Sequence, residues 1–159
     1  MERKKGKKDT PILEKIGNTY YVRWNYKEES EEEVTYNEIH FPFKPTINII
    51  QETILGIENS KIDNKILSGF IWNNMSVWLS SENQFNYKVA YDLAVQTNGA
   101  NLPITFKFGD TENPVYHVFS TVEELREFYT KAVNFVNETL KEGWTEKDLI
   151  PWKDYEELL

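Results

Sequence analysis

Residues 122–143 constrain the fold more than any other stretch, because their apolar side chains recur at the spacing of an α-helix. Residues 120–124 hold two overlapping capping boxes, a pattern typical of a helix start. Gly143 is a common helix stop and predicts the end of the element. One face of this helix carries Val122, Leu125, Phe128, Tyr129, Ala132, Phe135, Val136 and Leu140. A stripe this wide has to be buried against other parts of the chain.

Two β-hairpins are predicted ahead of this helix. Residues 102–108 and 114–119 are rich in apolar and aromatic side chains and are separated by a polar, glycine-containing turn. Residues 66–72 and 75–79 flank Asn73-Asn74, a dipeptide that tolerates positive φ and favours a two-residue turn. A third hairpin is expected from residues 18–26 and 34–43, because the side chains that face the core and those that face solvent alternate along both segments. The acidic residues between the two segments are expected to form a solvated tip.

Two further helices separate the hairpins. The first begins at Thr46 and ends near Glu58, with the polar residues 59–64 as a loop, and its apolar face consists of Ile47, Ile50, Ile54 and Ile57. The second begins at Ser80 or Ser81 and ends at Asn98-Gly99. Its helix face consists of Phe85, Val89, Ala90, Leu93, Ala94 and Gln96.

This order of elements predicts an α+β fold, in which antiparallel hairpins alternate with helices and the sheet packs against the helices. The chain length suits one domain with an additional arm. We predict a flexible basic arm over residues 1–17 and a hairpin plus helix over 18–64. An α+β domain over 65–143 and a C-terminal tail over 144–159 complete the chain.

Composition excludes several classes of protein. The chain has no cysteine, which excludes disulfides, thiolate catalysis and cysteine-ligated metals. A net charge of -8 argues against binding to the nucleic-acid backbone. The beginning lacks the apolar stretch of a secretory signal, and no apolar run reaches the ~18 residues of a membrane span. The cluster of basic residues within positions 3–8 predicts a solvated N-terminus, and a docking arm for an acidic partner is the alternative.

Chemical motifs are lacking elsewhere. His40 and His117 are the only imidazoles, and a metal site would need more ligands at suitable spacing. Asp110 lies near His117 across a predicted hairpin, but strand histidines are usually structural. The glutamates of residues 123–142 suit a helix start and a solvated face. We therefore predict no catalytic residue, no metal and no cofactor.

Aromatic residues offer candidates for partner binding. Trp72, Trp144, Trp152 and Tyr155 are predicted to contact a partner protein, because large rigid rings dominate binding hot spots. Burial in the chain's own core is the alternative for each of them. Trp78 lies within an alternating strand and is expected in the core.

A family resemblance covers residues 66–152. The sequence Trp78-Leu-Ser-Ser-Glu-Asn-Gln84 is similar to a domain of unknown function from tail-region proteins of tailed bacteriophages and prophages. The similarity continues through residues 91–100, 102–109, 115–117, 128–129 and 142–144. Because these segments are structural in character, the resemblance implies a fold and a setting but no catalytic residues.

The resemblance implies a non-enzymatic structural or adaptor protein that contacts tail fibre or baseplate proteins. Its location would be the virion, or the host cytoplasm during assembly, and a homo-oligomer is possible. The alternative is a tail-fibre assembly chaperone that is absent from the mature virion. A small hydrolase of host glycans that uses His117 and Asp110 is a third hypothesis.

Overall fold

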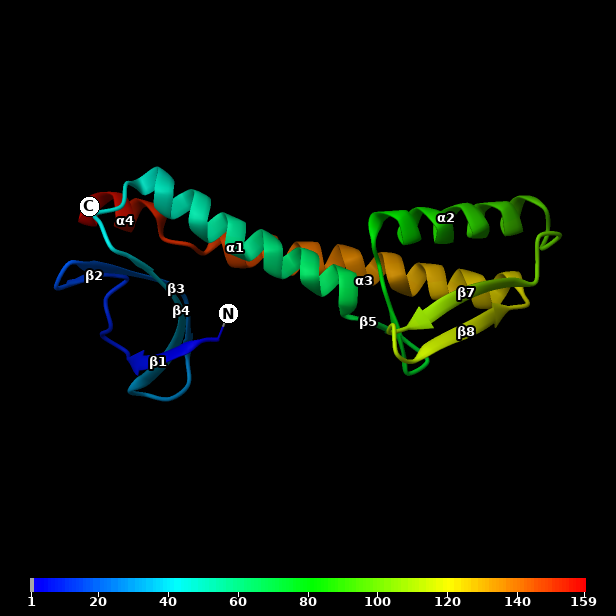
Figure 1. Cartoon of the computed structure of the whole chain (residues 1–159), viewed down its shortest axis with the longest axis horizontal. Helices are drawn as coiled ribbons and strands as arrows, with labels where there is room; N and C mark the ends of the chain where they lie inside the picture. Colours follow the sequence, from blue (N-terminus) through cyan, green and yellow to red (C-terminus); the bar gives the residue numbers. More distant parts are fainter. Residues whose placement is uncertain (1) are drawn as a thin grey trace. The chain divides into compact units, whose positions relative to one another are not determined.

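The computed structural model describes residues 2–159 and confirms the α+β class. Helices and antiparallel strands are both prominent (Figure 1). In chain order the elements are β1 (Lys4–Lys7), β2 (Leu13–Ile16), β3 (Thr19–Glu28), β4 (Glu33–Phe41), α1 (Ile47–Ser68), β5 (Phe70–Trp72), β6 (Met75–Val77), α2 (Ser81–Gln96), β7 (Ile104–Gly109), β8 (Pro114–Phe119), α3 (Val122–Asp148) and α4 (Trp152–Leu158).

The chain divides into two compact units. Unit 1 consists of Met1–Glu58 and Trp144–Leu159, and unit 2 consists of Asn59–Gly143. The boundaries fall within α1 and α3, so each of these helices contributes residues to both units. The predicted division at residues 64 and 143 therefore needs correction, because the segment 144–159 belongs to unit 1 and is not a separate tail.

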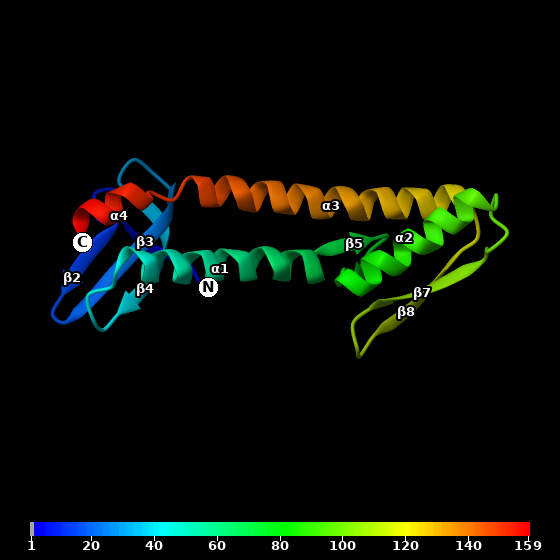
Figure 2. The same ribbon diagram turned by 90° about the horizontal axis from the view of Figure 1, so that it is seen from above.

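Unit 1 is a four-stranded antiparallel sheet with helical segments on one face. The strand order is β1-β4-β3-β2, and the predicted β3–β4 hairpin pairs Tyr20 with Phe41 at one end. Its register shifts between Trp24 and Lys27, where Asn25 has a positive φ of 58°. The first half of α1 and α4 cover the same side of the sheet (Figures 1 and 2).

The core of unit 1 contains a buried carboxylate. Glu58 is 1% exposed and accepts hydrogen bonds from Trp24 Nε1 at 2.7 Å and from Asn37 Nδ2 at 3.3 Å. Since Trp24 is on β3 and Asn37 is on β4, these bonds join α1 to both strands. Glu58 also supplies the acceptor that the buried indole N–H of Trp24 needs. Around them pack the apolar residues Val22, Phe41, Ile50, Ile54, Ile150 and Tyr155.

The N-terminal residues are ordered strands, which corrects the prediction of a flexible arm over 1–17; Met1 lies outside the described residues. β1 pairs with β4 from Lys4↔Tyr36 to Lys7↔Glu33, and β2 pairs with β3. Gly6 passes so close to the Tyr36 ring that a Cβ would lie 2.7 Å from it. β1 is an edge strand, and lysines on an edge discourage pairing with other chains. Lys4, Lys5 and Lys7 therefore belong to a paired strand with exposed side chains.

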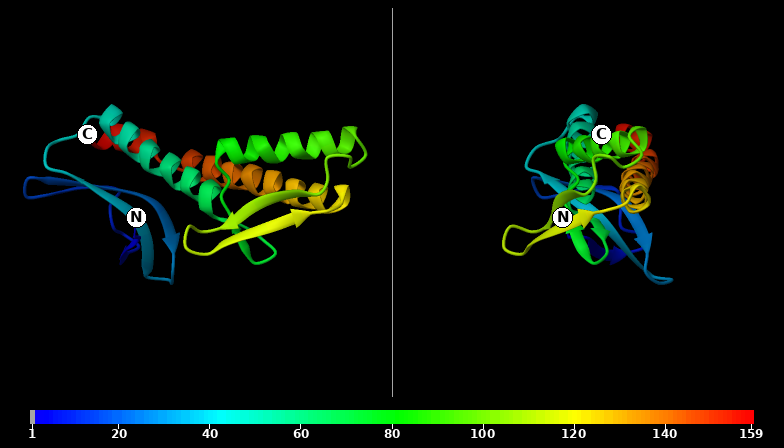
Figure 3. Two further views of the ribbon diagram at one scale, coloured as in Figure 1. Left: turned by 45° about the vertical axis from the view of Figure 1, so that its right-hand side comes forward. Right: turned by 90° about the vertical axis from the view of Figure 1, so that its right-hand side faces the viewer.

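Unit 2 contains two hairpins and the helices against which they pack (Figure 3). Asn73 and Asn74 form the predicted turn between β5 and β6, with φ values of 46° and 63°. The predicted β7–β8 hairpin pairs Ile104 with Phe119 and continues in register to Gly109↔Pro114. Ser80 is the N-cap of α2, because its side chain accepts from the Asn83 N–H.

The core of unit 2 is dominated by aromatic rings around Phe128 of α3. Phe128 is fully buried, and six rings lie within 6.2 Å of its centroid, those of Phe70, Trp72, Tyr87, Phe106, Phe108 and Phe119. These rings come from β5, α2, β7 and β8. One position of α3 therefore joins most elements of the unit, and tilted or edge-on ring pairs of this kind add to the burial energy.

Two predicted helix ends were wrong. α1 continues through the polar residues 59–64 to Ser68, and α3 continues past Gly143 to Asp148. Gly143 is buried, and a Cβ at this position would lie 2.2 Å from Cδ1 of Ile62 in α1. The missing side chain allows α1 and α3 to approach closely. This glycine is therefore a packing position and not a stop.

We expect Gly143→Val to lower the free energy of unfolding by about 1–3 kcal/mol, because the new side chain overlaps Ile62 in a packed contact. Chemical denaturation followed by tryptophan fluorescence measures the change. Gly56→Val is the matched control, since Gly56 is also inside a helix but has nothing within 4 Å of its Cβ position. That variant should change the free energy by less than about 0.5 kcal/mol. Equal effects of the two substitutions would contradict this role of Gly143.

Candidate functional site

Large apolar side chains are exposed along α2 of unit 2. Phe85, Val89 and Leu93 follow one another at intervals of four residues and are 64%, 47% and 45% exposed. Residues spaced in this way lie on one face of a helix. We call these three residues the α2 stripe.

The stripe is exposed because α2 has two apolar faces. The buried face consists of Tyr87, Ala90 and Ala94, which pack into the aromatic core. The two alanines are small and allow α2 to lie close to the core. The sequence-based interpretation merged Phe85 and Leu93 with the alanines into one face, which the structure corrects.

A groove separates α2 from β7 and is bordered by the stripe. It has a volume of about 470 Å³, and β7 contributes Ile104 and Phe106 to its wall. Asn83 and Asn101 lie among its polar lining residues. This α2–β7 groove therefore combines apolar walls with a few amide groups, as binding sites commonly do.

Trp78 is exposed, contrary to the prediction that it lies in the core. Its side chain is 52% exposed, whereas its neighbours Val77 and Leu79 are each 1% exposed. Trp78 lines a second hollow of about 620 Å³, which we call the Trp78 hollow. Asn83 lines both this hollow and the α2–β7 groove, so the two adjoin.

The four predicted partner-binding residues differ in exposure. Trp72 is 3% exposed and Tyr155 is 0% exposed, so both belong to the cores of their own units and the prediction is wrong for them. Trp152 is partly buried against the core of unit 1. Trp144 is 56% exposed and remains a candidate. Neither the α2–β7 groove nor the Trp78 hollow was predicted from the sequence.

His117 and Asp110 are engaged with different neighbours. His117 Nε2 lies 2.8 Å from Glu124 Oε1 of α3, and its ring contacts Phe119. Asp110 Oδ1 instead accepts the backbone N–H groups of Glu112 and Asn113 within the β7–β8 turn. Although His117 and Asp110 belong to the same hairpin, each is therefore bound to other groups, and the two do not form an acid–base pair.

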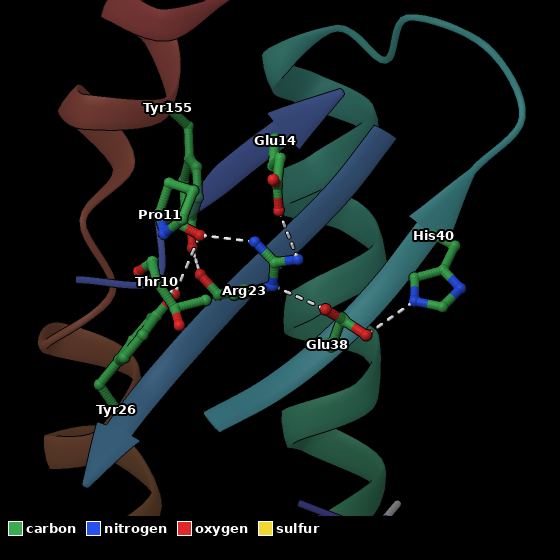
Figure 4. A network of polar contacts seen from close by, with 8 residues as sticks. All are labelled: Thr10, Pro11, Glu14, Arg23, Tyr26, Glu38, His40 and Tyr155. Atoms are coloured by element: carbon green, nitrogen blue, oxygen red, sulfur yellow. Dashed lines mark hydrogen bonds and ion pairs between the residues drawn. The ribbon is translucent and has the colours of Figure 1, made fainter. Parts of the chain in front are cut away.

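A network of polar contacts surrounds Arg23 on β3 of unit 1 (Figure 4). Arg23 is 5% exposed and pairs with Glu38 at 2.6 Å and with Glu14 at 2.9 Å, while Nη1 donates to the Pro11 carbonyl. Glu38 also contacts His40 Nε2 at 2.8 Å. The guanidinium thus joins β2, β3 and β4, which is a structural role.

Two tyrosines extend this network through backbone carbonyls (Figure 4). Tyr26 donates to the Thr10 and Pro11 carbonyls, and burial raises its pKa to about 12. Tyr155 donates to the Arg23 carbonyl, and burial raises its pKa as well. Both phenols therefore stay protonated near neutral pH and serve as donors that fix the loop before β2 and helix α4.

Neither a metal centre nor a membrane span is found among residues 2–159. No three His, Asp or Glu side chains in this range gather as a cation site requires. Within the same range, none of the helices has the length and apolarity needed to cross a bilayer.

Comparisons with family models, with curated proteins and with solved structures found no match to this chain.

We expect the stability of unit 1 to fall in acid partly through Glu38. Burial acts to raise the pKa of Glu38, but hydrogen bonds from His40 and Arg23 outweigh it and hold the pKa below its usual 4.5. A lowered pKa stabilises the fold above the unfolded-state pKa, and this contribution is lost as pH falls through the folded-state value. Glu38→Gln should therefore flatten the dependence of unfolding free energy on pH below about 4.5.

The control is Glu28→Gln, because the hydrogen bond from Lys8 also lowers the pKa of Glu28, but both side chains of this pair are exposed and solvent screens their interaction. At neutral pH, Glu38→Gln should cost about 1–3 kcal/mol because a hydrogen bond between charged groups is lost. Thermal or urea unfolding across a pH series measures both effects. A Glu38→Gln variant with the full acid sensitivity of the original chain would contradict the assignment.

Proposed function

We propose that this chain is a non-enzymatic protein that acts through protein–protein contacts, with the α2 stripe as its principal docking surface. The observation that carries the proposal is the exposure of Phe85, Val89 and Leu93 on a helix whose opposite face is locked into the core. Such a helix cannot turn to bury the stripe without losing its inner contacts. The stripe is therefore available to a partner.

The physical basis is removal of apolar surface from water. Burial of such surface contributes roughly 25 cal/mol per Å², and a phenylalanine provides a large part of the area that an interface needs. Phe85 and Leu93 lie on either side of Val89 and border the α2–β7 groove. A complementary apolar segment of the partner would fill this groove, as peptides do in helix-and-groove recognition.

A polar rim lies next to the stripe. Lys88 and Asp92 are one helical turn apart on α2 and form an exposed ion pair. Exposed pairs contribute little energy but favour correct orientation of a partner. An apolar centre with charged neighbours is the usual anatomy of a protein interface.

The absence of grouped reactive side chains supports a non-enzymatic role. Within residues 2–159, each imidazole contacts a single carboxylate, Glu38 for His40 and Glu124 for His117. The carboxylate of Glu38 is also bound to Arg23, which favours its ionised form. The His117–Glu124 pair joins β8 to α3, whereas His40 and Glu38 both lie on β4.

We propose tail fibre or baseplate proteins of a tailed bacteriophage as partners, on the basis of the resemblance at residues 78–84 and the segments that follow. The chain would then be a structural or adaptor protein of the tail region. A tail-fibre assembly chaperone is the second candidate, since the same stripe would bind a fibre chain before assembly. Mass spectrometry of purified virions separates the two, because only the structural protein stays in the particle.

We expect Phe85→Ser with Leu93→Ser to weaken binding to the fibre or baseplate protein by at least about thirtyfold, as truncation of two hot-spot residues would. Val95→Ser is the matched control, because Val95 is also on α2 and is 43% exposed but lies outside the stripe. Cross-linking mass spectrometry identifies the partner, and calorimetry with the purified proteins measures affinity.

Folding should be little affected, since all three substituted positions are exposed. Unchanged affinity of the double variant would reject the stripe as the docking surface. Failure of the chain to bind any tail protein, in virions or in assembly intermediates, would reject the phage setting.

A further inference from the structure

We propose that the Trp78 hollow binds a neutral oligosaccharide, a function beyond the protein contacts of the α2 stripe. The hollow has a volume of about 620 Å³, which lies within the range of about 300–1,000 Å³ usual for small-ligand sites. Its aromatic lining residues are the exposed Trp78 and the almost fully buried Phe108, and the hollow also has groups that donate or accept hydrogen bonds. These polar residues are Ser68, Ser76, Asn83, Lys107, Asp110 and Thr111.

Trp78 is held in place although its ring is exposed. The Val77 and Leu79 side chains on either side are fully buried, and the Leu79 N–H donates to the Leu67 carbonyl at 3.0 Å. The Asn83 side chain donates to the Trp78 carbonyl at 2.8 Å. The indole is thus presented from a fixed backbone, so binding to it costs little ordering entropy.

The β7–β8 turn, which contributes Asp110 to the lining of the hollow, is held by hydrogen bonds. Asp110 Oδ1 accepts the N–H groups of Glu112 at 2.9 Å and Asn113 at 2.7 Å, and these bonds fix the carboxylate. The backbone hydrogen bond from Asn113 lowers the pKa of Asp110, so the group is ionised at neutral pH. Gly109, at a positive φ of 81°, makes this turn possible.

The balance of charge indicates the class of ligand. Lys107 and Asp110 are the only charged residues lining the hollow, and their charges are opposite. A strongly anionic ligand would meet the carboxylate, and a cationic one would meet the ammonium group. A neutral ligand with many hydroxyl groups can donate to Asp110 and accept from Lys107.

A sugar ring fits the remaining surface. The face of an indole is apolar and electron-rich, and the C–H groups on one face of a pyranose carry a small positive charge. The two therefore stack, while hydroxyl groups at the ring edge reach the polar residues. A peptide would instead need a deep apolar pocket for an anchoring side chain, and the apolar residues that line this hollow besides Trp78 are Val77 and Phe108, which are only 1% and 2% exposed and offer little surface.

The test uses the indole N–H signals of isotopically labelled full-length protein in a proton–nitrogen correlation spectrum. The probes are tetrasaccharides of α- and β-linked glucose, mannose, galactose and N-acetylglucosamine at millimolar concentration. We expect at least one probe to shift the Trp78 signal, which Trp78→Phe assigns. Trp144 is the internal control, because it is 56% exposed, close to the 52% of Trp78, but belongs to unit 1.

Variants then test the two walls of the hollow. Trp78→Ala and Asp110→Asn should each weaken binding of the active tetrasaccharide at least about tenfold, as loss of a principal contact does. Phe85→Ser should leave sugar binding unchanged, so this result is independent of the α2 stripe. Thermal unfolding checks that the variants are folded.

Three results would overturn the proposal. One is no Trp78 shift with any of the tetrasaccharides. Another is an equal shift of Trp78 and Trp144, which would indicate non-specific contact. The third is sugar binding that survives both Trp78→Ala and Asp110→Asn. If Trp78→Ala weakens only the binding of a tail protein, the hollow belongs to the protein interface and the sugar site is rejected.

Discussion

The contacts of Phe128 hold unit 2 together. This one ring of α3 lies 5.0 Å from Tyr87 of α2, 5.4 Å from Trp72 of β5 and 5.1 Å from Phe119 of β8, measured between centroids. Two short hairpins have little stability alone and need a helix to cover one face. Phe128 supplies that cover for both hairpins, so the orientation of each element around α3 is fixed by where its aromatic ring can reach.

The same constraint leaves apolar groups in water. α2 contributes Tyr87 to the cluster around Phe128, and this contact turns the face of α2 that carries Tyr87 toward the core. Phe85 and Leu93, on another face of α2, are therefore left exposed to water. The segment from the end of β6 to Leu79 behaves similarly, since Val77 and Leu79 are buried and Trp78 between them is exposed. The exposed stripe and the exposed indole are therefore consequences of a tightly ordered core. Buried neighbours thus hold the backbone beneath both surfaces, which lowers the entropy that binding would cost.

Local patterns in the sequence predicted most of the elements but not their ends. The turn at Asn73-Asn74, the start of α3 and the hairpin from β7 to β8 depend on neighbouring residues and were predicted correctly. Gly143 and the lysines of β1 could not be interpreted locally, because Ile62 and Tyr36 lie far away in sequence. The two apolar faces of α2 had a readable signal, since Tyr87 interrupts the periodicity of Phe85, Val89 and Leu93. Which face is buried depends on the long-range contact to Phe128.

The most direct test is hydroxyl-radical footprinting of Phe85 in the free protein and in its complex with a fibre or baseplate protein. In the free protein Phe85 should be oxidised much faster than Tyr87, which is 4% exposed. In the complex, Phe85 and Leu93 should become protected while Val95 keeps its free rate. Slow oxidation of Phe85 in the free protein, or undiminished oxidation in the complex, would contradict the view that α2 presents an open docking stripe.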